Sequence, residues 1–153
     1  MPEFGYSFEK YDSSLYVKTS GRELNVSPKT SREICNYIKN MGVNKAKSEL
    51  EEVIKKKKSV PFKRYKLKVG HRSEFSHFHA GRYPVKAAKL ILKLLYNLES
   101  NAEFKGVDVD KLTLVHCSVS IGRKLKRYVP RAFGRTSPSF KSLIHIELVG
   151  REL

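Results

Sequence analysis

Two segments of alternating apolar residues enclose a long acid-free segment, and this arrangement restricts the fold more than any other feature. Residues 112–121 alternate, with Val115, Cys117, Val119 and Ile121 on one predicted face. Residues 143–149 repeat the pattern, with Ile144, Ile146 and Leu148 predicted to point inward. Alternation with a period of two predicts half-buried strands. The segment between them, residues 122–142, has almost no apolar period, so we expect a hairpin with a buried base and an unburied end.

The predicted hairpin is too long to lie within its own domain. If strand pairing continues to Tyr128, the arm that starts at Leu112 is roughly 55 Å long at about 3.3 Å per residue. A globule of this chain length is only about 40 Å across. An isolated hairpin is marginally stable, and repulsion among its like charges weakens it further. We therefore expect the hairpin to project from the core and to need a partner that orders it.

The remaining pattern predicts one more strand and three helices. A strand is expected over residues 15–26, followed by a helix with Ser27 as N-cap and a stop at Gly42. Asn44 is predicted to cap a second helix, and a single glycine between two short helices suggests an αα-hairpin. A third helix is expected from Pro84 to about residue 104, closed by the glycine at position 106.

Together these elements predict an α+β fold of three helices packed on a small antiparallel sheet, with a long protruding β-hairpin. A length of 153 residues fits a single domain, residues 1–153. It would include a basic insert at residues 55–83 and an extended hairpin at residues 112–149 with its tip near 128–135. Met1 to Ser14 is expected to be either an ordered arm that contacts a partner or a frayed terminus, with Tyr6, Phe8 and Tyr11 favouring the arm.

The charge of the chain predicts a polyanionic partner. The 31 Lys and Arg residues exceed the 15 Asp and Glu residues by 16 charges, far more than solubility requires. Basic residues concentrate in two acid-free segments, residues 55–72 and 122–142. Phe62 and Tyr65 are interleaved with the first set, and Tyr128, Phe133 and Phe140 with the second, as suits base stacking beside phosphate contacts. No DNA recognition helix is apparent, so RNA is the expected partner, and a disordered, solvated loop is the alternative for the hairpin.

The side chains expected to bind RNA are the basic residues of both segments and their close neighbours. They are Lys29, Lys57, Lys58, Lys63, Arg64, Lys66, Lys68, His71, Arg72, Arg82, Arg123, Lys124, Lys126, Arg127, Arg131, Arg135 and Lys141.

Catalysis, metal binding and membrane insertion have little support in the sequence. Only His77 and His79 lie close together, without metal-ligand spacing or an acid pair, so we expect no metal and no cofactor. An RNA-processing enzyme, the alternative class, would need clustered carboxylates or histidines, whereas Glu49, Glu51 and Glu52 fit a solvated helix face. The most apolar stretch, residues 85–98, is interrupted by three lysines and cannot span a bilayer. No secretory signal begins the chain, and Cys35 and Cys117 are expected as reduced, buried thiols, so a cytoplasmic location is predicted.

An ordered series of motifs runs along nearly the whole chain. The motifs are Asn25-Val26-Ser27-Pro28-Lys29 with Arg32-Glu33-Ile34, Val60-Pro61-Phe62, Val69-Gly70-His71-Arg72, Gly81-Arg82-Tyr83-Pro84-Val85-Lys86-Ala87-Ala88, Asn101-Ala102-Glu103-Phe104-Lys105-Gly106 and Pro130-Arg131-Ala132-Phe133-Gly134-Arg135. The series resembles one family, the universal ribosomal large-subunit protein twenty-two, in its archaeal and eukaryotic branch.

The resemblance implies a non-enzymatic role in the large ribosomal subunit, with large-subunit ribosomal RNA and neighbouring ribosomal proteins as partners. A non-ribosomal RNA-binding protein is the alternative. The resemblance places the hairpin arm, Arg123 to Arg127, in RNA, and it places the tip along the tunnel that the nascent peptide follows. The tip residues it implies are Tyr128, Val129, Pro130, Arg131, Ala132, Phe133, Gly134 and Arg135.

Overall fold

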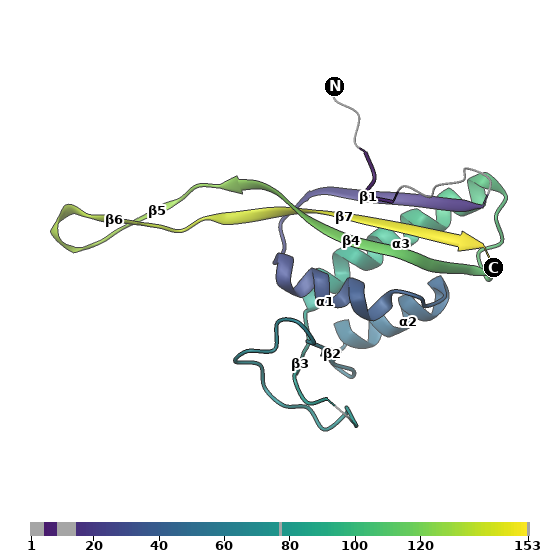
Figure 1. Cartoon of the computed structure of the whole chain (residues 1–153), viewed down its shortest axis with the longest axis horizontal. Coiled ribbons are helices and arrows are strands. Elements are labelled where there is room, and N and C mark those ends of the chain that lie inside the picture. Colours follow the sequence, from purple (N-terminus) through teal and green to yellow (C-terminus); the bar gives the residue numbers. More distant parts are fainter. Residues whose placement is uncertain (1–4, 9–14, 77, 153) are drawn as a thin grey trace.

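A three-stranded antiparallel sheet organises the computed structural model, which describes residues 5–8, 15–76 and 78–152. Its strand order is β1 (Tyr16–Leu24), β7 (Lys141–Glu152) and β4 (Leu112–Leu125). Helices α1 (Pro28–Ile38) and α3 (Val85–Lys105) pack against one face of this sheet, and α2 (Val43–Ile54) packs mainly on α3 (Figure 1). The predicted α+β class is confirmed.

Two shorter strand pairs lie outside this sheet. Strand β2 (Val60–Pro61) pairs with β3 (Gly81–Arg82) at the two ends of the basic insert. Strand β5 (Tyr128–Pro130) pairs with β6 (Thr136–Pro138), and a single 3₁₀ turn, η1 (Ala132–Gly134), joins them. The pair β5 and β6 continues the hairpin of β4 and β7 far beyond the helices (Figure 1). The projecting hairpin that the alternation predicted is therefore present.

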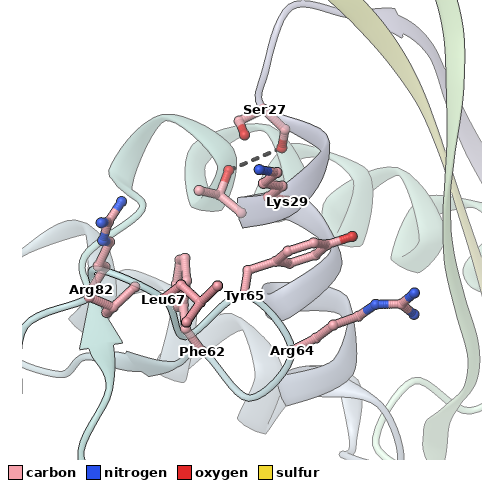
Figure 2. A pocket seen from close by; sticks show the side chains of 9 residues that line it. Ser27, Lys29, Phe62, Arg64, Tyr65, Leu67 and Arg82 are labelled. Carbon is pink, nitrogen blue, oxygen red and sulfur yellow. Dashed lines mark hydrogen bonds between the residues drawn. The ribbon is translucent and has the colours of Figure 1, made fainter.

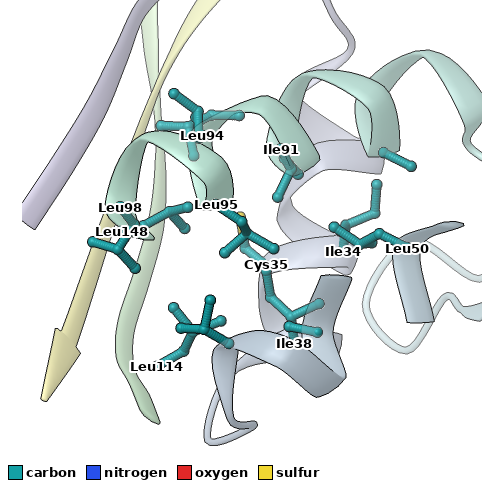
Figure 3. Close-up of a cluster of buried hydrophobic side chains, with 14 of the residues drawn as sticks. Ile34, Cys35, Ile38, Leu50, Ile91, Leu94, Leu95, Leu98, Leu114 and Leu148 are labelled. Atoms are coloured by element: carbon teal, nitrogen blue, oxygen red, sulfur yellow. The ribbon is translucent and has the colours of Figure 1, made fainter. Parts of the chain in front are cut away.

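The core lies between the sheet and the helices. Inward-pointing side chains of β7 meet the apolar stripe of α3 and one face of α1, as the sequence periodicity predicted (Figure 3). Ile144, Ile146 and Leu148 are fully buried. The other central side chains are Ile34, Cys35, Ile38, Leu50, Ile91, Leu95, Leu98, Leu112 and Leu114.

Helix α3 ends where the sequence predicted. Gly106 has φ of 72°, a left-handed conformation that costs glycine little because it has no Cβ atom. The backbone N–H groups of Gly106 and Val107 donate to the carbonyls of Glu103 and Ala102, each at 3.0 Å. Among the described residues, no helix is both long enough and apolar enough to cross a bilayer.

The connection between α1 and α2 differs from the prediction. Helix α1 ends at Ile38 and not at Gly42, because the following backbone bonds to β4: Asn40 N donates to Leu114 O at 2.8 Å, and Leu114 N donates to Met41 O at 2.9 Å. Asn40 supplies the left-handed residue, with φ of 65°, which asparagine tolerates better than most residues.

The second helix also begins differently. Its N-cap is Gly42, and the Asn44 side chain instead donates to Asp110 Oδ1 at 2.8 Å. Because α2 packs mainly on α3, the predicted αα-hairpin of α1 and α2 is wrong. Burial against α3 decides the direction of α2, and the local sequence does not contain that information.

The predicted faces of β4 are correct only from Cys117 onward. Leu114 pairs with Gly150 and His116 pairs with Val149, so a β-bulge at Val115 inserts an extra residue. Leu112 and Leu114 are fully buried, Val115 is only half-buried, and Cys117 and Val119 pack against the core. Ile121, predicted on the same inward face, is 62% exposed because the strand has left the helices by then.

Replacing Leu95 with alanine should destabilise the domain by about 2–5 kcal/mol, because the side chain is fully buried and its removal leaves a cavity. Phe104→Ala on the same helix removes a larger side chain that is 93% exposed, and should change stability by less than about 0.5 kcal/mol. Urea denaturation of both variants measures this. Equal losses would show that burial does not govern this helix.

Candidate RNA interface

The outer hairpin carries all seven basic residues of residues 122–142 on exposed positions. Within the described residues, none of these side chains has a hydrogen-bond or ion-pair partner. No acidic residue lies between Asp110 and Glu147 to neutralise them. The hairpin therefore presents uncompensated positive charge along its length. The seven residues are Arg123, Lys124, Lys126, Arg127, Arg131, Arg135 and Lys141.

Pairing continues along the hairpin despite this repulsion, with one irregularity near its base. Ile121 pairs with Ile144 and Lys124 pairs with Ser142, so β4 contains a second extra residue here. A Cβ atom on Gly122 would lie 2.6 Å from Nε2 of His145, so only glycine allows the imidazole ring to cover this backbone. The ring in turn accepts the backbone N–H of Glu23 at Nδ1, at 3.1 Å. These contacts hold the hairpin to the end of β1.

A second break separates the long strands from β5 and β6. Ser139 N donates to Arg127 O at 2.7 Å across it. The rings of Tyr128 and Phe140 pack edge to face with centroids 5.9 Å apart, so these two aromatic residues support the hairpin itself. Each ring is still at least half exposed, at 60% and 51%, and leaves area for a partner.

A tight loop closes the hairpin at its tip. Arg131 N donates to Arg135 O at 2.8 Å, and Phe133 has φ of 57°, which is strained for a bulky residue. The Phe133 side chain is 97% exposed. A large apolar ring held outward at the end of a charged hairpin is expected to contact another molecule.

The basic insert at residues 55–83 is fixed to the domain by a buried carboxylate. Glu33 on α1 is 1% exposed and accepts three consecutive backbone N–H groups. Lys63 donates at 3.2 Å, and Arg64 and Tyr65 each donate at 2.8 Å. The backbone turns around Glu33, with the side chains of Lys63 and Arg64 exposed and that of Tyr65 packed against the edge of the core. The sequence analysis did not select Glu33, because nothing local shows that it faces a loop 30 residues further along the chain.

A second carboxylate joins the two ends of the insert. Glu74 accepts the backbone N–H and the hydroxyl of Ser59, each at 2.8 Å, and the hydroxyl of Tyr83 at 3.0 Å. The hydrogen bonds from Ser59 lower the pKa of Glu74 below its usual value. Arg72 lies over the Tyr83 ring, 4.8 Å from its centroid. The insert is therefore an ordered structure made mostly of turns.

The basic side chains predicted in the insert are exposed, with one exception. Lys58 is half-buried and forms an ion pair with Glu49 at 2.7 Å. Burial raises the pKa of Glu49, but hydrogen bonds from Lys58 and Tyr37 outweigh it and lower the pKa overall. The charge of Lys58 is compensated within the domain, whereas Lys57, Lys63, Lys66 and Lys68 stay available.

A pocket of about 280 Å³ lies where the insert meets the start of α1. Phe62, Tyr65, Leu67 and Val69 from the insert form its apolar part (Figure 2). Lys29, Arg64 and Arg82, all predicted to bind RNA, surround it. Tertiary structure thus brings together basic residues that are up to 53 positions apart in the sequence.

A Ser-His-Glu cluster on the other face of the sheet does not have catalytic geometry. Ser7 Oγ lies 3.0 Å from Nε2 of His116 but donates to Glu147 Oε2 at 2.7 Å. In a catalytic triad the carboxylate holds the other ring nitrogen, Nδ1, whereas Glu147 approaches Nε2 at 3.9 Å. Burial lowers the pKa of His116, and the nearby Glu147 opposes this only in part. The cluster fixes residues 5–8 on the sheet.

The structure describes only part of the predicted N-terminal arm and of the histidines considered as metal ligands. Of the expected N-terminal arm, residues 1–4 and 9–14 lie outside the described residues, and so does His77. Within the described part of the chain, no three His, Cys, Asp or Glu side chains gather as a metal site would require. Cys35 is buried, Cys117 is half-buried, and both are free thiols. Burial raises the pKa of Cys117 to about 12, which disfavours the thiolate form.

A buried α+β core that carries an uncompensated basic hairpin and a basic insert defines a structural nucleic-acid-binding protein. The family model described as "Ribosomal protein L22p/L17e" matches residues 19–151, and the chain belongs to this family. It is 51% identical over 152 residues to "Large ribosomal subunit protein uL22" of Cenarchaeum symbiosum, covering 99% of both chains. It is 45% identical over 149 residues to the protein of that name in Archaeoglobus fulgidus, covering 97% of this chain and 96% of the relative. The predicted family is confirmed.

Glu33→Ala should release the insert, because three part-buried N–H groups lose their acceptor at a cost of up to roughly 1–3 kcal/mol for each group left unsatisfied. We expect amide hydrogen exchange of Lys63, Arg64 and Tyr65 to accelerate at least tenfold, with exchange in α3 unchanged. Glu103→Ala, which removes an exposed carboxylate, is the control. Unchanged exchange at these three amides in the Glu33 variant would contradict the anchoring role.

Proposed function

We propose that this chain is a structural constituent of the large ribosomal subunit, where it binds ribosomal RNA, contacts neighbouring ribosomal proteins and acts in the cytoplasm without catalysing a reaction. Residues 1–153 act as one domain. The hairpin of residues 112–149 and the insert of residues 55–83 are its RNA-binding extensions. The observation that carries this proposal is the hairpin itself, with seven exposed basic side chains and no internal counter-charge.

The arm and the tip of the hairpin have separate roles in this proposal. The arm, Arg123 to Arg127 with Lys141, docks in RNA, because extended phosphate contacts fix position without reading sequence. The tip, residues 128–135, faces the tunnel that the nascent peptide follows. Its apolar side chains Val129 and Phe133 are 46% and 97% exposed, as a contact surface requires.

The basic side chains proposed to contact RNA are those expected from the sequence, with Lys58 as the weakest because of its ion pair with Glu49. The hairpin contains one of the two acid-free segments, and the insert contains the other and forms a second contact region. Two separated basic surfaces allow the domain to hold more than one RNA segment. Such bridging is suited to assembly of a large ribonucleoprotein.

Arm and tip variants should separate docking from tunnel function. Replacing the arm residues Arg123, Lys124, Lys126, Arg127 and Lys141 by glutamine should impair incorporation into large subunits, because docking loses its phosphate contacts. Deleting residues 129–134 with a short turn as closure should leave incorporation near wild type and slow nascent-chain passage. The measurement is the fraction of tagged protein in gradient-purified large subunits.

A matched control removes five exposed lysines outside both basic segments, and it should reduce incorporation less than the arm variant does. These lysines are Lys39, Lys45, Lys86, Lys89 and Lys93. If the tip deletion abolishes incorporation while the arm variant assembles normally, the division between a docking arm and a tunnel-facing tip is wrong.

Binding to large-subunit RNA should depend steeply on salt. With about six to ten phosphate contacts, affinity falls roughly 10³- to 10⁵-fold between 50 and 200 mM salt through counterion release. Lys63→Gln should make the salt dependence less steep, reducing the magnitude of the slope of log affinity against log salt by about 1. Lys58→Gln should lower it less, because Glu49 already neutralises that lysine. Filter binding over a salt series measures both slopes, and a flat response would contradict the polyanion interface.

A further inference from the structure

We propose that the pocket between the insert and α1 binds one unstacked RNA nucleotide, with its base against Tyr65 and Leu67 and its phosphate between Lys29 and Arg64. This inference rests on the proposed function and names a specific site within it. The sequence predicts base stacking at Phe62 and Tyr65 in general, and the pocket gives a single defined place for it. A nucleotide pocket would let it select an unpaired nucleotide over a duplex.

The apolar part of the pocket suits the flat face of a base. Phe62 is 2% exposed and forms the floor, and the Tyr65 ring lies half-buried beside it (Figure 2). Leu67 is 87% exposed within a strongly basic segment. An apolar side chain held in water at the edge of an aromatic floor is stabilised by being covered, and a stacked base would cover it.

Cations surround this apolar part. Lys29 Nζ and the Arg64 guanidinium lie 5.7 Å and 5.9 Å from the centroid of the Tyr65 ring, and the Arg82 guanidinium lies 5.9 Å from that of Phe62. Arg82 is held in place because it donates to the carbonyl of Lys68 at 2.9 Å. Among the residues that the structure describes, no acidic side chain lines the pocket. Its occupant should therefore combine a flat apolar group with a negative charge, as a nucleotide does.

The size of the pocket restricts the occupant further. A volume of about 280 Å³ is at the lower end of ligand pockets, which range over roughly 300–1,000 Å³. It can hold one base but not a stacked pair or a duplex. Proteins that recognise RNA by its bases generally bind unpaired nucleotides and stack them on aromatic or arginine side chains.

The pocket is formed before the ligand arrives. Glu33 fixes the backbone of Lys63, Arg64 and Tyr65, and Phe62 N donates to Ala80 O at 2.9 Å. Because both ends of this turn are held, the aromatic and basic side chains need little ordering on binding. Preorganisation lowers the entropic cost of binding and so raises the affinity for a single nucleotide.

The test uses the full chain with a ten-nucleotide uridine RNA that carries 4-thiouridine, and with an RNA duplex of equal length. Tyr65→Ala should weaken binding of the single strand about tenfold, in the lower part of the range for loss of one stacked base. It should change binding of the duplex less than twofold. Tyr65→Phe should retain single-strand affinity, because the ring remains. Photocrosslinking should attach the thiouridine to the peptide containing residues 62–69.

Tyr96→Ala is the matched control. Like Tyr65, Tyr96 has a lysine over its ring, Lys47 at 4.9 Å, but Tyr96 is exposed and does not line this pocket. It should change neither affinity. Amide exchange at Lys63, Arg64 and Tyr65 shows whether Tyr65→Ala leaves the insert folded, and Leu67→Ser is a second variant that should weaken single-strand binding without touching the turn.

Three results would overturn the nucleotide pocket. Equal weakening of single strand and duplex by Tyr65→Ala would make the pocket a general phosphate surface. If Tyr65→Ala changed neither affinity and the thiouridine crosslinked only to the hairpin, the pocket would not be an RNA-binding site. Capture of an acidic peptide in place of RNA would make it a protein-docking site. In all three the chain still binds RNA, whereas wild-type protein that binds neither RNA would overturn the proposed function itself.

Discussion

The pairing of β4 with β7 is the interaction on which the rest of the structure depends. Strand β4 begins in the core and β7 ends there, with Leu112, Leu114, Ile146 and Leu148 fully buried, and the other half of each strand lies in the solvent-exposed hairpin. Two strands with this much uncompensated charge would not pair stably alone. Because their inner halves are fixed by apolar burial and by β1, the register and direction of the outer halves are fixed as well. The core therefore sets the direction in which the basic hairpin projects.

The acidic residues stabilise the insert without neutralising most of the basic side chains. Glu33 and Glu74 bind backbone N–H and hydroxyl groups of the insert, and they do not bind its basic side chains. The ion pairs of the described residues, such as Lys47 with Glu99 and Lys58 with Glu49, lie outside the exposed outer hairpin, residues 122–142. The acids order the extensions while leaving most basic side chains available for an external polyanion. A domain with the same net charge but randomly placed acids would lose this separation.

The sequence predicted those features that follow from local periodicity and composition. The stripe of α3, the end of that helix at Gly106 and the inward face of β7 came from apolar spacing and from the conformational freedom of glycine. The projecting hairpin followed from the estimated length of its arm, which exceeds the width of the domain. Its apolar ends alternate as core strands do, and its charged middle does not. The positions of the exposed basic residues were predictable because lysine and arginine without acidic partners remain in water.

Contacts between distant segments could not be predicted in this way. The end of α1 at Ile38 depends on hydrogen bonds from residues 40 and 41 to Leu114, more than 70 positions away. The bulge at Val115 shifts the inward face of β4 by one residue, which periodicity does not reveal. The insert read as a basic loop, yet Glu33 folds it into a pocket lined by Lys29, Tyr65 and Arg82.

The sequence by itself thus determined the class of fold, the family and the sign of the charge on each extension, because periodicity, motif order and composition are local properties. Only the tertiary structure decided which residues share a site. The pocket between α1 and the insert exists because a buried carboxylate binds three consecutive N–H groups from a segment about 30 residues away. That contact becomes favourable only when the core excludes water from Glu33 and leaves those N–H groups without another acceptor.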